Sequence, residues 1–117
     1  MDYQGSCHCG AIQFEFHGPQ IDRGLRCNCS ICIRKGALMT AYTIAPEAIT
    51  IVVRDDALAT YTFGTGVARH HFCKHCGIYT FHETIRAPGN YRVNIGCVAD
   101  VDAMQLPVTV FDGATLL

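Results

Sequence analysis

Eight cysteines, seven of them in tight clusters, constrain this chain of 117 residues more than any other feature. In order, the clustered cysteines are Cys7 and Cys9, then Cys27, Cys29 and Cys32, then Cys73 and Cys76. A disulfide framework is typical of short secreted domains with a small hydrophobic core. This chain is 50% hydrophobic, and thiols two or three residues apart are badly placed to bridge each other but well placed to bind one ion. The clusters therefore indicate metal ligands in a reducing compartment.

The spacing of the cysteines favours zinc as the metal. All-thiolate sites with Cys-x-x-Cys pairs suit zinc, and iron–sulfur clusters are the main alternative. Ferredoxin-type clusters need a fourth cysteine at short range, and none follows Cys32. We therefore expect zinc.

The number of clustered cysteines divides as four plus three. Zinc held by four cysteines is a closed structural site, whereas three protein ligands leave one position for water or substrate. The most economical division makes Cys27, Cys29 and Cys32 a three-thiolate site with an open face. The closed site would then contain the first and last pairs, Cys7, Cys9, Cys73 and Cys76.

Cys97 is the alternative fourth ligand, and it would close the second site. It follows Val93 and Ile95 in a segment whose apolar residues alternate, so all three share one strand face. Because free cysteine often packs as a small buried hydrophobe, we expect Cys97 in the core. The outer pairs are followed by Gly10 and Gly77, which let the backbone turn tightly around a sulfur atom.

Short segments rich in β-branched and aromatic residues predict a mainly β protein, with antiparallel sheets in a single domain over residues 1–117. Helical periodicity is nearly absent, apart from a short helix expected over residues 29–34. Five phenylalanines should pack between the sheets: Phe14, Phe16, Phe63, Phe72 and Phe81. The expected strands cover residues 11–16, 37–44, 49–53, 59–63, 69–73, 78–82, 91–97 and 109–111.

The charge balance argues against two classes of partner. Nine Lys and Arg against ten Asp and Glu give a net charge of -1, so the chain lacks the basic surface that binds nucleic acid or an acidic membrane. No apolar run approaches the roughly 18 residues of a membrane span, and the first residues lack a signal-peptide layout. We expect a cytoplasmic protein, in which an exposed edge strand could support a homodimer.

Three cysteine blocks carry a family resemblance: GSCHCG at residues 5–10, CNCSIC at residues 27–32 and FCKHCG at residues 72–77. A later segment, NIGC at residues 94–97, precedes the acidic turn Asp100-Val101-Asp102. With these segments the chain resembles, over nearly its whole length, the glutathione-dependent formaldehyde-activating enzyme family, also called the centromere protein V/Gfa family.

The resemblance implies the Mss4-like β-tent fold with two zinc ions. One would be structural, at the four outer cysteines, and one catalytic, at Cys27, Cys29 and Cys32. The family's activity is the synthesis of S-(hydroxymethyl)glutathione from formaldehyde and glutathione, formally a carbon–sulfur lyase reaction. The implied partners are therefore a small thiol, with glutathione as co-substrate, and an aldehyde.

Glutathione carries two carboxylates, so a site for it should offer cations. Arg26, Arg34 and Lys35 flank the cysteine triplet and are candidate substrate-binding residues, although lysines and arginines are common on any protein surface. On a strand, His70 and His71 face opposite sides, and one of them could reach the open site as a ligand or proton carrier.

Two functions from different classes remain. The first is a zinc-dependent lyase that adds a small thiol to formaldehyde or a related aldehyde. The second is a non-catalytic zinc-binding module that binds another protein, as other Mss4-like proteins do. The cysteine triplet distinguishes them, because an open coordination position favours chemistry and a closed one favours a structural role.

Overall fold

The computed structural model describes residues 1–117. Its two short helices are α1 (Ser30–Lys35) and α2 (Gly113–Leu116), and three 3-10 turns lie at Pro46–Ala48, Ile95–Cys97 and Ala103–Gln105. The strands are β1 (Asp2–Ser6), β2 (Ile12–His17), β3 (Gly24–Cys27), β4 (Met39–Thr40), β5 (Ile49–Val53), β6 (Leu58–Tyr61), β7 (Arg69–Cys73), β8 (Tyr79–Glu83), β9 (Tyr91–Val93) and β10 (Val108–Phe111). No helix is long and apolar enough to cross a membrane. The mainly β fold expected from the sequence is confirmed.

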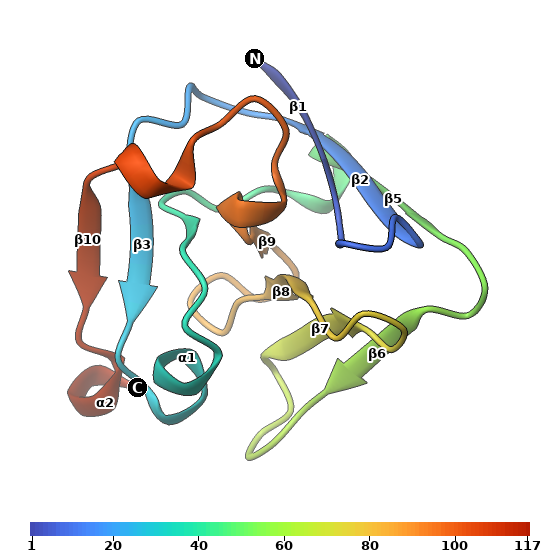
Figure 1. Ribbon diagram of the computed structural model, residues 1–117. Helices are drawn as coiled ribbons and strands as arrows, with labels where there is room; N and C mark the ends of the chain where they lie inside the picture. The colour runs from blue at the N-terminus through green and yellow to red at the C-terminus, as the bar shows by residue number, and fades with distance from the viewer.

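The strands form three small sheets, in the orders β1-β2-β5, β10-β3-β4 and β6-β7-β8-β9. Every pairing within them is antiparallel except that of β3 with β10, which is parallel. Because β3 and β10 run in the same direction, the helices that follow them, α1 and α2, begin at the same edge and lie side by side (Figure 1). This arrangement brings two distant chain segments to one end of the molecule.

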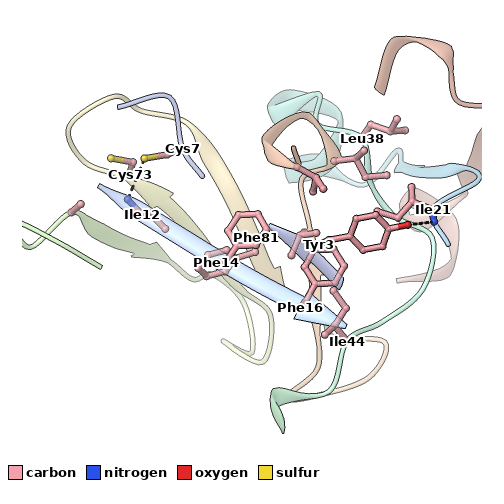
Figure 2. Packing of buried hydrophobic residues seen from close by; sticks show 14 residues of the cluster. Tyr3, Cys7, Ile12, Phe14, Phe16, Ile21, Leu38, Ile44, Cys73 and Phe81 are labelled. Carbon is pink, nitrogen blue, oxygen red and sulfur yellow. Dashed lines mark hydrogen bonds between the residues drawn. The ribbon is translucent and has the colours of Figure 1, made fainter. Parts of the chain in front are cut away.

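The core lies between the sheet of β2 and the sheet of β8. Along β2, Ile12, Phe14 and Phe16 are buried and the residues between them are exposed, as the period of two requires. Phe14 meets Phe81 of β8 edge to face, with 5.8 Å between the ring centroids, and Figure 2 shows this contact in the middle of the cluster. The alternating sequence of β2 thus explains its packing.

Several expected strands differ from the structure. Residues 37–44 contribute only the two-residue strand β4, because Leu38 packs into the core and its carbonyl accepts a hydrogen bond from Ile95 outside any ladder. The strand expected over residues 91–97 ends at Val93. There the side chain of Asn94 accepts from Gly96 N–H and turns the chain into a 3-10 helix. Strands β1 and β3 were not expected, and neither was the parallel β3–β10 pairing.

Two of the five phenylalanines do not pack between the sheets. Phe63 is 46% exposed in the connection between β6 and β7, where it stacks on His70 with 5.9 Å between the ring centroids. Phe72 is half-buried, since on β7 it points away from the face that buries Cys73. Phe14, Phe16 and Phe81 are buried as expected.

Phe81 is the largest side chain with almost no exposure, at 1%, so Phe81→Ala should be strongly destabilising. We expect the free energy of unfolding of the metal-loaded protein to fall by about 3–5 kcal/mol, measured by urea denaturation. The exposed Phe63 provides the control, and Phe63→Ala should cost at most about 1 kcal/mol. Equal losses in the two variants would contradict this placement of the core.

Candidate functional site

The first and last cysteine pairs meet in one cluster of four thiols. The Sγ atoms of Cys7, Cys9, Cys73 and Cys76 all lie within 4.8 Å of one another. Cys9 Sγ is 3.6 Å from both Cys7 Sγ and Cys73 Sγ. A zinc–sulfur bond of about 2.3 Å puts tetrahedral ligands about 3.8 Å apart, whereas a disulfide needs about 2.05 Å. The donor set therefore fits a structural zinc ion and does not fit disulfides.

Local backbone geometry builds this cluster from two similar turns. In each pair, the first cysteine donates its backbone N–H, at 3.0 Å, to the carbonyl five residues later. The glycines that follow the pairs, Gly10 and Gly77, have φ angles of 82° and 77°, which confirms the tight turns expected from the sequence. Ile12 N–H also donates to Cys7 Sγ at 3.3 Å, the dashed line beside Cys73 in Figure 2.

These surroundings lower the pKa of two of the four thiols, those of Cys7 and Cys76, whereas neighbouring thiols raise the pKa of Cys9 to about 11. For Cys76, burial works against ionisation, but the backbone N–H groups of Cys9 and Ile78 and the neighbouring thiols lower the pKa to about 6. The histidines inside the two pairs are not among the ligand atoms. His8 is exposed, and His75 donates from Nε2 to the carbonyl of Asp55 at 2.8 Å.

A second cluster contains only three thiols, those of Cys27, Cys29 and Cys32, again within 4.8 Å of one another. Cys27 ends β3 and Cys29 caps α1, so the turn between these elements gathers the sulfur atoms. Burial opposes ionisation of Cys29, but the backbone N–H and the thiol of Cys32 lead the groups that hold its pKa below the ordinary value. The three-thiol set fits zinc with one position left for another ligand.

Cys97 belongs to neither cluster. It is half-buried, packs against the hydrophobic core and has its Sγ 3.8 Å from the carbonyl of Tyr79. Burial raises the pKa of its thiol to about 11, assisted by the charges of Cys7 and Cys76. The expectation that Cys97 packs in the core instead of completing the open site is confirmed.

The short helix α2 covers one side of the three-thiol cluster. Asn28 fastens it, since its Nδ2 donates to Asp112 at 3.0 Å and its Oδ1 accepts from Ala114 N–H at 2.8 Å. Gly113 is buried against the cluster, where a Cβ would collide with Cys27 Sγ. Glycine at this position therefore allows the backbone of α2 to approach Cys27 and Cys29 closely.

A cavity of about 580 Å³ opens beside the three-thiol cluster. All three cysteines line it, and so do three cations, Lys35, Arg86 and Arg92. No Asp or Glu side chain lines the cavity, and most of the other lining residues are hydrophobic. The cavity is therefore an apolar space with positive charge on its wall and thiols at one side.

A group of hydrogen-bonded polar side chains joins Lys35 to the two histidines that line this cavity. Lys35 Nζ donates to Tyr79 Oη at 3.0 Å and to His82 Nδ1 at 3.2 Å. Tyr79 Oη is 2.6 Å from His70 Nδ1. Tyr79 Oη is also 2.9 Å from His82 Nδ1, but that nitrogen already accepts from Lys35. We therefore assign the single hydroxyl proton of Tyr79 to the shorter contact with His70, which places the ring proton of neutral His70 on Nε2. That atom is buried and has no hydrogen-bond partner.

Both cavity histidines are held neutral. Burial, followed by the charge of Lys35, lowers the pKa of His70 to about 4 and that of His82 to about 2. His71 lies on the other side of β7, where its Nε2 is 2.8 Å from Glu83 Oε2 and its Nδ1 is 2.9 Å from Thr60 Oγ1. The two consecutive histidines thus face opposite sides, and His70 is the one that lines the cavity.

Of the three cations expected beside the triplet, only Lys35 lines the cavity. Arg26 donates to the carbonyl of Gly36 at 3.0 Å, and Arg34 donates to the carbonyl of Ser30 at 2.7 Å, both at exposed positions. Sequence reasoning missed Arg86 and Arg92. The available signal was the position of Arg92, a charged residue inside the apolar run that forms β9.

Comparisons with known proteins agree with this geometry. The model of the family described as glutathione-dependent formaldehyde-activating enzyme matches residues 2–113. The chain belongs to the glutathione-dependent formaldehyde-activating enzyme family. A Halomonas elongata protein, named only provisionally as such an enzyme, is 38% identical in an alignment of 83 residues that covers 65% of this chain and 52% of that protein. The chain thus matches about half the length of this curated relative.

A solved structure supports the same assignment of the fold. The crystal structure of a Rhodobacter sphaeroides protein superposes with a TM-score of 0.80 and 35% sequence identity. The superposition covers 91% of this chain and 99% of the other. The arrangement of three small sheets therefore recurs across nearly the whole of both chains.

The two cysteine clusters should respond differently to substitution. Cys73→Ser should leave the domain unfolded or aggregated, because metal binding at the four-thiol cluster is coupled to folding. Cys29→Ser should give a folded protein that has lost one metal ion per chain. Metal content by mass spectrometry and folding by circular dichroism check both variants.

Cys97→Ala is the matched control for these cysteine variants, and it should keep both metal ions at the cost of a small packing loss. Unfolding of Cys29→Ser would contradict the division of the cysteines into a fold-defining cluster of four and a separate cluster of three.

Neutral His70 makes stability depend on pH. Its pKa is 6.5 in the ordinary case and about 4 here, so between these values the unfolded chain binds one proton more than the folded protein at this residue. Stability should therefore fall as the pH drops from about 6.5 to about 4. His70→Gln should lessen the slope by up to about 1.4 kcal/mol per pH unit, measured by urea denaturation at constant metal content.

A slope in His70→Gln equal to that of the wild type would contradict a neutral, buried His70.

Proposed function

We propose that this protein is a zinc-dependent carbon–sulfur lyase of the S-(hydroxymethyl)glutathione synthase type, which adds a thiol such as glutathione to formaldehyde or a related aldehyde. The observation that carries the proposal is the three-thiol cluster, which has no fourth protein ligand within reach and faces a cavity. The four-thiol cluster would hold a second, structural zinc ion.

Cys27, Cys29 and Cys32 would hold the catalytic zinc ion, which supplies a position where a substrate thiol loses its proton and becomes nucleophilic. The chain provides the surroundings for this chemistry. Lys35 lies at the thiols; burial lowers its pKa, and the charges of the thiols, with that of Cys32 foremost, oppose this and favour its ammonium form. Its positive charge offsets part of the negative charge that three cysteine thiolates and a substrate thiolate bring together.

The reaction forms one carbon–sulfur bond. The thiolate sulfur attacks the carbonyl carbon of the aldehyde, and the π electron pair moves to the oxygen, which takes up a proton. The proton that the thiol lost and the proton that the oxygen gains balance, and the reverse sequence is the lyase direction. No oxidant or reductant is required.

His70 is suited to assist at the aldehyde oxygen. The buried Nε2–H of its neutral ring lacks an acceptor, and the residue lines the same cavity as the thiols. A hydrogen bond from this group to the oxygen would stabilise the negative charge that develops during attack. The Tyr79 hydroxyl, 2.6 Å from His70 Nδ1, holds the ring in the required tautomer.

A second candidate function is a non-catalytic zinc-binding module that binds a protein or a second copy of the chain. The observation in its favour is the edge strand β10, which presents Val108 and Val110 with 47% and 68% exposure. Exposed apolar side chains on a free strand edge can pair with another strand. In this case both metal sites would be structural.

The test combines metal coordination with turnover. Glutathione is titrated into cobalt-substituted protein, and the visible spectrum should change as its sulfur joins the three-thiol site. In parallel, exchange between formaldehyde, glutathione and their adduct is followed by magnetisation-transfer NMR on the zinc protein. The exchange rate should rise well above the spontaneous rate in the wild type and in Cys97→Ala, and return to it in Cys29→Ser. A metal-loaded protein that leaves both the spectrum and the rate unchanged would favour the binding module.

A further inference from the structure

Arg92 is a buried cation without an acidic partner. It lies in β9 with 7% exposure, and its Nη1 donates to the carbonyl of Thr40 at 2.9 Å. None of the ion pairs in the protein involves it. A guanidinium has five N–H donors, and burying its charge is costly unless an anion compensates. The protein itself supplies no carboxylate for this purpose.

Arg86 adds a second unpaired cation at the same cavity. Its Cζ lies 3.7 Å from the centroid of the Phe111 ring, which holds the guanidinium flat against the wall. Arg86 and Arg92 line the same cavity, and after burial the like charge of Arg86 is the main influence that lowers the pKa of Arg92. Two neighbouring guanidinium groups without an acid indicate a place for a bound anion.

The other charged side chains near the cavity do not pair with Arg86 or Arg92. Lys35 is engaged with Tyr79 and His82. Arg69, outside the cavity, is paired with Glu83 at 3.2 Å. The thiol of Cys27 favours the charged form of Arg92, but no hydrogen bond joins the two residues. The anion that Arg86 and Arg92 would bind must therefore come from outside the chain, through the cavity that both line.

We infer that Arg92 and Arg86 bind a carboxylate of the thiol substrate while its sulfur lies at the three-thiol cluster. This inference rests on the proposed function, since it names the residues that bind the carboxylate of the same thiol substrate. The planar guanidinium of Arg92 can donate two parallel hydrogen bonds to a carboxylate, which fixes the orientation of the bound molecule. The apolar side chains that line the same cavity suit the carbon chain that joins sulfur to carboxylate. The substrate class is a thiol that carries a carboxylate, and uncharged thiols are poor substrates.

The test compares 3-mercaptopropionate with its methyl ester, which has the same thiol and no negative charge. Binding of each to cobalt-loaded, full-length protein is followed by the visible spectrum. The wild type should bind the acid roughly 10- to 100-fold more tightly than the ester. Arg86→Gln should lose most of this preference, and Arg92→Lys should reduce it, because a lysine cannot reproduce the bidentate contact. Affinity for the ester should stay within about twofold in both variants.

Arg86 is exposed, so Arg86→Gln keeps the test valid even where Arg92→Lys folds poorly. Arg54→Gln is the matched control, because Arg54 is exposed and does not line the cavity, and it should keep the full preference. Equal affinity of the wild type for acid and ester would overturn this inference and leave the proposed function intact. Failure of both thiols to alter the spectrum would overturn the proposed function itself.

Discussion

Four thiols converge on one point where the sheet β1-β2-β5 meets the sheet β6-β7-β8-β9. Cys7 and Cys9 lie in the turn between β1 and β2, whereas Cys73 ends β7 and Cys76 lies in the turn between β7 and β8. A metal ion bound by all four thiols would connect the end of one hairpin to the end of another. The closure spans more than half of the chain, so the loss of chain entropy on folding is large and must be offset by metal–ligand bonds. Metal binding there would add to the stabilisation that the buried hydrophobic core provides.

The connection between β5 and β6 contacts the four-thiol cluster region through residues that lie between Cys73 and Cys76. In this connection, Asp55 and Asp56 both have positive φ angles near 55° and 53°. Lys74 Nζ pairs with Asp56 at 2.7 Å, and His75 donates to the Asp55 carbonyl. The residues between Cys73 and Cys76 thus fix the neighbouring turn as well as the ligand spacing. Strands from two sheets are joined at this corner without a continuous ladder between them.

Local patterns made much of the fold predictable from the sequence. The cysteine spacing identified both clusters, and the strict alternation in β2 marked its buried face. The parallel pairing of β3 with β10 could not be foreseen, because it joins two four-residue strands far apart in the chain. The position of α2 beside the three thiols depends on that pairing, so it could not be predicted from the sequence either.

The cations illustrate the same limit at the site. Arg26 precedes Cys27 on β3, so the two side chains point to opposite sides of the strand. Lys35 lies three residues after Cys32 on α1, and this spacing places both on one helix face. Simple periodicity therefore distinguishes Lys35 from its neighbours. Arg92 reaches the same cavity from a strand that is remote in sequence, and only the folded arrangement of β9 beside β4 places it there.

The separation of the cysteines along the chain also fixes an order of events during protein synthesis. The three-thiol cluster is complete once residue 32 has left the ribosome, whereas the four-thiol cluster needs residue 76. A growing chain therefore presents its local metal site long before the site that closes the fold. A nascent chain that has exposed only residue 32 therefore has no link yet between the turn after β1 and the turn after β7.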